Sequence, residues 1–266
     1  MQYKYNELEY AKKIYEDGFQ SNFVRYELVV LAKYLKTLEY SKRETVEFIY
    51  KFCEQHIEGF NEVKYYKIID KAIEDGRKKN NNLIVINSID IMESELKYID
   101  SLDIDDDYKK ILLSFLVNKK ISNAIARINY EDKEMSVYFN GTKKKYSEIY
   151  KQSKTKRKYD INLVIAELIK KQLIISIKKG DIVLSFIENI PKVDSDNVFL
   201  KLTPDNFEDA GFLFDYYKGD KKIKFCSECG KLIKTTNNKT KYCNECGDEK
   251  ERIRKREWKR KNSVAK

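Results

Sequence analysis

Four of the five cysteines in this 266-residue chain have the spacing of a metal site. Cys226 and Cys229 belong to one Cys-x-x-Cys-Gly motif, and Cys243 and Cys246 belong to a second one near the C-terminal end. Two thiolates separated by two residues can bind one metal ion from a tight turn, and a second pair completes a tetrahedral set of sulfur ligands. The spacing therefore predicts one structural Zn²⁺ ion.

The residues around these cysteines support a zinc site over the alternative of disulfides. Gly230 and Gly247 each follow the second cysteine of a pair, where a positive φ would turn backbone amides toward the sulfur, and we expect both in that conformation. The segment Met1 to Lys13 is polar and lacks the apolar core of a secretory signal, which indicates a cytoplasmic protein with reduced thiols. Four sulfur ligands leave no coordination position open, so we expect the metal to stabilise a fold and not to catalyse.

Positive charge is concentrated in the same part of the chain. From Lys221 to Lys266 there are twelve lysines and four arginines against six acidic residues, an excess of ten that equals the net charge of the whole chain. Residues 248 to about 261 are predicted to form a helix with acidic residues at its start and basic residues beyond, as the helix dipole favours. Five cations lie on one face of this helix: Arg252, Lys255, Arg256, Lys259 and Arg260.

A cationic face of this kind suits the phosphate backbone of a nucleic acid, because each phosphate that it neutralises releases condensed counterions. Trp258 on the same helix could stack on a base or pack against the cysteine ribbon. A solvated helix that only raises solubility is the alternative interpretation.

The segment from Phe225 to Arg260 resembles the CGNR zinc-finger tails and similar Cys-x-x-Cys-Gly tails of phage and mobile-element proteins. The matching features are the paired cysteines, Lys241-Tyr242-Cys243 at the second pair, Cys246-Gly247 within it, and the basic run that follows. Asp248-Glu249 stands where that family has Asn-Arg. The resemblance implies DNA binding by a regulator.

The first eighty residues are predicted to form a bundle of four helices, because apolar residues recur at helical spacing. Ser41 and Glu44 predict a capping box, and Asn61 is placed to cap a helix that runs to about Gly76. The inner side of that fourth helix is expected to carry Val63, Tyr66, Ile69, Ala72 and Ile73. Cys53 and His56 are interpreted as residues of an apolar helix side and not as metal ligands. This bundle is a candidate surface for dimerisation or for a protein partner.

The middle of the chain, residues 83–190, has the element order of a winged helix. After a strand at 83–86 and a short helix at 94–98, the pattern predicts a helix from Asp107, a strand near 135–139, helices near 146–152 and from Asp160, and a hairpin at 174–186. In a winged helix the third helix enters the major groove and the hairpin contacts the DNA backbone. The predicted phosphate contacts are Lys143, Lys144, Lys145, Lys154, Lys156, Arg157 and Lys158, with Lys178 and Lys179 at the hairpin tip, and Asn162 is the candidate for base reading.

The chain lacks the common catalytic motifs, including a phosphate-binding loop, a nucleophile elbow and a His-Glu-x-x-His helix, so we expect no enzymatic activity. No run of about 20 apolar residues could cross a bilayer. We therefore expect a mainly α, α+β protein. Its predicted parts are a helical domain (1–80), a winged-helix-like domain (83–190), a connecting segment (191–220) and a zinc ribbon with a basic helix (221–266). The expected function is DNA binding, as a transcription regulator or replication accessory of a phage-like element. A protein-binding adaptor or inhibitor that docks through the ribbon, and an RNA-binding protein, are the alternatives.

Overall fold

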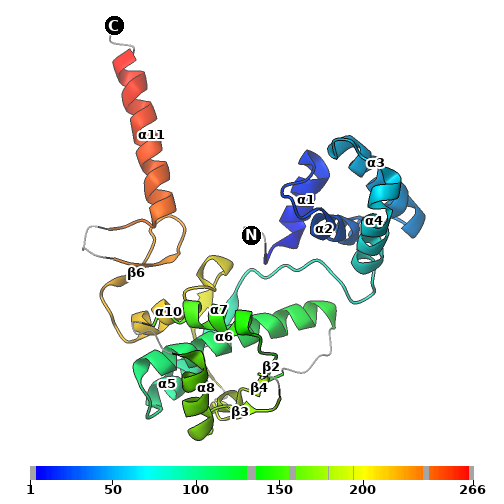
Figure 1. Ribbon diagram of the computed structural model, residues 1–266. Coiled ribbons are helices and arrows are strands. Elements are labelled where there is room, and N and C mark those ends of the chain that lie inside the picture. Colours follow the sequence, from blue (N-terminus) through cyan, green and yellow to red (C-terminus); the bar gives the residue numbers. More distant parts are fainter. Residues whose placement is uncertain are drawn as a thin grey trace. The chain divides into compact units, whose positions relative to one another are not determined.

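The computed structural model describes residues 4–130, 136–155, 160–178, 180–193, 195–235 and 240–263, with side chains up to Arg260. The chain forms two compact units, Met1–Asn87 with Ile121–Met135, and Ser88–Lys120 with Ser136–Lys266. The protein is mainly helical with small antiparallel sheets (Figure 1), which confirms the predicted fold class. The predicted four-part division of the chain stays a prediction. Every helix in the described part of the chain is too short or too polar to cross a bilayer.

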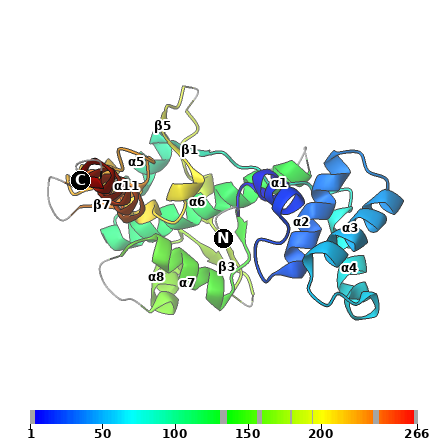
Figure 2. The ribbon, with the colours of Figure 1, turned by 90° about the horizontal axis from the view of Figure 1, so that it is seen from above.

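The first unit is built on four helices, α1 (Glu7–Asp17), α2 (Val24–Thr37), α3 (Lys42–His56) and α4 (Glu62–Gly76), which Figure 2 shows as a bundle. Its core contains Ile14, Leu31 and Ile69, all fully buried. The predicted capping box is confirmed, because the Glu44 amide donates to the Ser41 hydroxyl at 3.2 Å and the Ser41 amide donates to the Glu44 carboxylate at 2.7 Å.

The prediction of the inner face of α4 is only partly confirmed. Ile69, Ala72 and Ile73 are buried, but Val63 is 89% exposed and Tyr66 is 54% exposed. The first turn of α4 therefore lacks the burial that helical periodicity predicted for it. Cys53 is buried as expected, whereas His56 at the end of α3 is exposed.

The second unit begins with a strand pair that the sequence did not predict. Strand β1 (Ile89–Met92) pairs antiparallel with β5 (Val198–Leu202), and Ile89 lies opposite Leu202. The strand expected at 83–86 is wrong, since this stretch makes one isolated bridge, from Val85 to Asn6. The unit also contains α5 (Glu93–Ser101), which contacts β1, and further along the chain α9 (Ser185–Glu188), a 3-10 turn η1 (Pro204–Asn206) and α10 (Ala210–Tyr217). The connecting segment at 191–220 is thus largely structured.

The middle elements follow the predicted order of helix, strand, helix, helix and hairpin. They are α6 (Asp106–Asn129), β2 (Tyr138–Phe139), α7 (Lys143–Gln152), α8 (Ile161–Lys170), β3 (Ile175–Ser176) and β4 (Ile182–Val183). The three strands form one antiparallel sheet in the order β2-β4-β3. Phe115 of α6 packs edge-on against Phe139 of β2 with ring centres 5.1 Å apart, and Asp160 caps α8 by accepting from the Asn162 amide. The predicted strand to Phe186 is too long, because Phe186 lies in α9.

The β3–β4 hairpin is fastened at its turn to the corner between β2 and α7. Asp181 accepts hydrogen bonds from the Tyr138 hydroxyl and, at 3.1 Å, from the Gly141 amide. The Tyr146 hydroxyl donates to the Gly180 carbonyl. A side chain at Gly141 would meet that same carbonyl at 2.3 Å, so only glycine allows this close approach. The hairpin is consequently held in one position relative to α7.

Candidate metal centre and nucleic-acid interface

The four cysteines of the C-terminal ribbon converge on one point. Cys226 follows β6 (Ile223–Phe225), Cys229 lies before β7 (Leu232–Lys234), and Cys246 lies in the first turn of α11 (Asn244–Ser263). All four sulfur atoms lie within 4.8 Å of one another, and the sulfurs of Cys229 and Cys243 are 3.8 Å apart. Zn–S bonds of about 2.3 Å in a tetrahedron place sulfurs roughly 3.8 Å apart. The cluster therefore has the donor set and the size for one tetrahedral metal ion.

Backbone amides are directed at the sulfur atoms, as in metal–thiolate sites. The Cys243 amide donates to the Cys226 sulfur at 3.3 Å, and the Cys246 amide donates to the Cys243 sulfur at 3.4 Å. Gly230 has the expected positive φ, 70°, and its amide donates to the Cys226 carbonyl at 3.0 Å. The expectation for Gly247 is wrong, because its amide donates to the Cys243 carbonyl at 2.8 Å as part of α11, which begins earlier than predicted.

These contacts also change the acidity of the thiols. Burial raises the pKa of Cys226, but backbone amides of Cys229, Cys243 and Glu228 that donate to its sulfur outweigh burial and lower the pKa to about 6. Cys246 shows the opposite change, since hydrogen bonds to the Cys243 and Cys229 sulfurs raise its pKa. The cluster thus favours a thiolate at Cys226 and a protonated thiol at Cys246, and a divalent cation could replace that proton.

The basic helix starts within the cysteine cluster, and Figure 1 shows it as one continuous helix that leaves the ribbon. Its five predicted contacts are all exposed, namely Arg252, Lys255, Arg256, Lys259 and Arg260. Arg252 pairs with Glu249 at 3.4 Å, and Lys255 lies 3.5 Å from Glu251. Arg256 and Lys259 make no ion pair with a residue that the structure describes. Trp258 is 67% exposed on this helix, so it does not pack against the ribbon.

The predicted contacts in the middle of the chain have different surroundings. Lys143, Lys144 and Lys145 are exposed in the first turn of α7, and Lys178 is exposed at the hairpin turn. Asn162 is exposed on α8, where its amide donates to Asp160 at 3.1 Å. Lys154 is partly buried and pairs with Asp209 at 3.0 Å, so its ammonium also has a structural role. Lys156, Arg157, Lys158 and Lys179 lie outside the described residues.

Two residues that hold the ribbon in place, Asn206 and Lys250, were not predicted from the sequence. Asn206 of η1 is buried; its oxygen accepts from the Leu232 amide at 2.6 Å, and its amide donates to the Gly230 carbonyl at 3.2 Å. Lys250 of α11 pairs with Glu228 at 2.7 Å, which connects the helix to the first cysteine turn. These contacts join residues about 20 or more positions apart. Pro204, one of two prolines in the chain, marks the turn that carries Asn206 but not the contacts that Asn206 makes.

No protein-family model matches the chain, and no curated protein or solved structure matches it either.

Proposed function

We propose that Cys226, Cys229, Cys243 and Cys246 hold one structural Zn²⁺ ion. The sulfur-only donor set and its tetrahedral size support zinc among the metals of a reducing compartment such as the cytoplasm. The ribbon between β6 and β7 is too small to bury a core of its own, so the ion supplies the stability that the segment lacks. With four sulfur ligands the metal has no position for a substrate, and we assign it no catalytic role.

We further propose that the protein binds DNA through α11, as a regulator or replication accessory. The observation that carries this proposal is the place of Cys246, because a metal ligand in the first turn of α11 fixes the helix to the ribbon. The helix then presents its exposed cations to phosphates from a rigid support. The resemblance to CGNR-like tails of phage and mobile-element proteins supports the same function.

The middle elements support this function as a winged helix. The order from α6 to β4 and the sheet order β2-β4-β3 suit that architecture. Lys143 and Lys144 at the start of α7 and Lys178 at the hairpin turn are available for phosphates, whereas the Lys145 ammonium donates to the Asn140 carbonyl at 3.0 Å. The exposed positions of α8 offer little for base reading, since Leu163, 68% exposed, is one of them and Asn162 already bonds to its cap. Binding should therefore depend weakly on sequence.

A protein-binding adaptor is the second candidate, and the exposed apolar residues of the middle elements favour it. Leu163 on α8 is 68% exposed, and Ile175 and Ile177 on and beside the edge strand β3 are 54% and 48% exposed. Apolar side chains at the positions where a winged helix would contact DNA suit a protein partner better than phosphates.

Fluorescence anisotropy with labelled duplex DNA, single-stranded DNA and RNA across a salt series tests the proposal. The zinc-loaded protein should bind duplex DNA with a log-affinity that falls steeply with log salt. Changing Arg252, Lys255, Arg256, Lys259 and Arg260 to glutamine should abolish most of this binding. A matched control removes the same number of charges from exposed positions on α3 and α4: Lys42, Lys51, Lys64, Lys67 and Lys71.

The control variant should bind like the unchanged protein. Equal loss in both variants would mean that only net charge matters, and the α11 proposal would be rejected. Absence of binding to all three nucleic acids at low salt would favour the adaptor, and preference for RNA over both DNAs would replace DNA as the ligand.

A further inference from the structure

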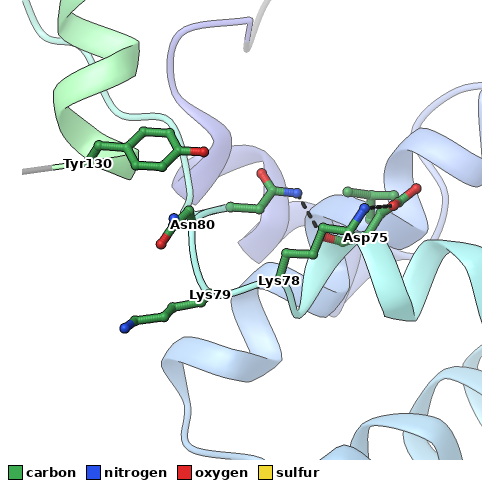
Figure 3. Close-up of a pocket in the computed structure, with 7 residues that line it drawn as sticks. Asp75, Lys78, Lys79, Asn80 and Tyr130 are labelled. Carbon is green, nitrogen blue, oxygen red and sulfur yellow. Dashed lines mark hydrogen bonds and ion pairs between the residues drawn. The ribbon is translucent and has the colours of Figure 1, made fainter. Parts of the chain in front are cut away.

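A pocket in the first unit lies beside the turn that follows α4. It has a volume of about 640 Å³ and is lined by Val29, Asp75, Lys78, Lys79, Asn80, Asn81 and Tyr130 (Figure 3). Two lysines, two asparagine amides and one aromatic ring form a polar lining with a single acidic group. None of these residues has a part in the proposed zinc site or in α11.

A backbone hydrogen bond and the Lys36 ammonium hold this turn in one conformation. The Asn81 amide donates to the Lys78 carbonyl at 3.2 Å and closes a β-turn whose two central residues are Lys79 and Asn80. The Lys36 ammonium donates to the carbonyls of Lys78 and Asn81 at 3.0 and 3.2 Å. Burial, with smaller effects of nearby Lys33 and Arg77, lowers the pKa of Lys36. One ammonium therefore fixes both ends of the turn.

Lys79 and Asn80, at the tip of the turn, have polar side-chain groups that are open to a ligand. No hydrogen bond or ion pair joins the Lys79 or Asn80 side chain to another residue in the described part of the chain, and Figure 3 shows Lys79 extending away from Asp75. The acidic group of the pocket is already neutralised, because Asp75 pairs with Lys78 at 2.7 Å and with Arg25 at 2.9 Å. The free ammonium of Lys79 is consequently available for an anion.

Tyr130 supplies an aromatic surface next to this turn. Tyr130 is 49% exposed, and its backbone amide donates to the Ala126 carbonyl at 2.8 Å, which holds the residue on the end of α6. Asn82 connects the turn to the same helix end, since its side chain donates to the Ile128 carbonyl and its amide donates to the Asn129 side chain, both at 2.9 Å. The ring and the backbone turn that carries Lys79 and Asn80 are thus held in place before any ligand arrives.

We propose that this pocket binds one nucleotide unit of a single-stranded nucleic acid. Tyr130 would stack on the base, Lys79 would pair with a phosphate, and the Asn80 amide, both donor and acceptor, would hydrogen-bond to the edge of the base. A duplex does not fit this chemistry, because its bases are already stacked and paired. The proposal is separate from duplex binding by α11 and stands if that binding fails.

Photocrosslinking of the full-length protein to an oligonucleotide that carries 5-iodouracil tests the site, because this base crosslinks efficiently to an aromatic ring on which it stacks. Peptide mapping by mass spectrometry should place the crosslink on Tyr130. The affinity is measured in the background with five glutamines on α11, so that the helix does not mask the pocket. In that background Tyr130→Ala should weaken single-strand binding about tenfold, as loss of one stacked base implies, and Tyr130→Phe should retain it.

Lys79→Glu should also weaken binding, whereas Lys67→Glu, the same charge change at an exposed position of α4, should not. Competition with unlabelled uridine monophosphate distinguishes a nucleic-acid strand from a free nucleotide as the ligand of the pocket. Little competition at equal nucleotide concentration supports the strand, and equal competition would overturn this part of the proposal. A crosslink that maps elsewhere, or equal effects of Lys79→Glu and Lys67→Glu, would overturn the site.

Discussion

At the scale of single residues, the two glycines of the cysteine pairs have different roles. An added Cβ would find open space at both, but Gly230 has a φ of 70°, whereas Gly247 lies in α11 without a positive φ. Gly230→Ala should cost about 1 kcal/mol of strain and weaken zinc binding roughly fivefold. Gly247→Ala should bind zinc as tightly as the unchanged chain and should favour the helix slightly. Competition for zinc with a chromophoric chelator measures the zinc affinity of both variants. Equal affinities would contradict the assigned conformations of the two glycines.

Cys53 differs from the other four cysteines because burial raises its pKa to about 12. An unfolded cysteine loses its proton near pH 9, so the unfolded chain binds fewer protons than the folded chain between these two values. Stability should therefore fall as the pH rises above 9. Cys53→Ala removes this contribution, and its free energy of unfolding should drop between pH 8.5 and 10 by about 1 kcal/mol less than that of the unchanged protein.

Urea unfolding at pH 8.5 and pH 10 measures this difference. The tyrosines and the ribbon thiols are present in both proteins, so their contributions cancel in the comparison. An identical decrease in both proteins would show that Cys53 does not stay protonated in the fold. Cys53→Ala should keep its full zinc content, which separates this thiol from the metal site.

At the scale of elements, the ion pairs on α11 divide its cations into two groups. Arg256 and Lys259 are free of ion pairs to described residues, whereas Arg254 pairs with Glu251 at 2.8 Å and lies off the five-cation face. Each phosphate neutralised contributes about 0.9 to the slope of log affinity against log salt. Arg256→Gln and Lys259→Gln should each lower the slope by roughly that amount, and Arg254→Gln should leave it nearly unchanged. Equal slopes for all three variants would mean that α11 has no preferred face.

The elements that could be predicted are those whose determinants are close in sequence. The paired cysteines, the Ser41–Glu44 capping box and the Lys178–Asp181 turn each depend on residues within a few positions. The β1–β5 pairing joins Ile89 to Leu202, and no local pattern marks such a partnership. Val63 and Tyr66 have helical spacing, but burial depends on whether a neighbouring helix reaches the first turn of α4.

The candidate site likewise combines features with determinants close in sequence and features that depend on distant residues. The convergence of the four cysteines and the cationic face of α11 follow from residue spacing, so both could be predicted from the sequence. The support from Asn206 and the bridge from Lys250 to Glu228 could not, because each depends on how separate segments pack. The start of α11 was placed too late because a metal-ligand turn and a helical first turn look alike in sequence.

At the scale of the whole molecule, the two units should respond differently to removal of the metal. The α1–α4 bundle has its own core and contains none of the four ligands. A chelator should therefore abolish duplex binding and reduce the helical signal of α11 while the bundle unfolds at an unchanged urea concentration. Circular dichroism and anisotropy on one chelated sample measure both.

A chain with Cys226→Ser and Cys243→Ser serves as the control, and the chelator should change it no further. Loss of the entire helical signal on chelation would show that the two units depend on the metal together. Full binding after chelation would show that α11 is held by its ion pairs alone.

The length of the cationic face on α11 sets a size for what the helix can cover. The residues from Arg252 to Arg260, at a rise of 1.5 Å each, extend over about 13 Å. B-DNA advances 3.4 Å per base pair, so this face laid along the double helix reaches past roughly four base pairs. Oligonucleotides shorter than that would leave part of the face without a phosphate to contact. The smallest duplex that binds with full strength should then be shorter than one turn of DNA.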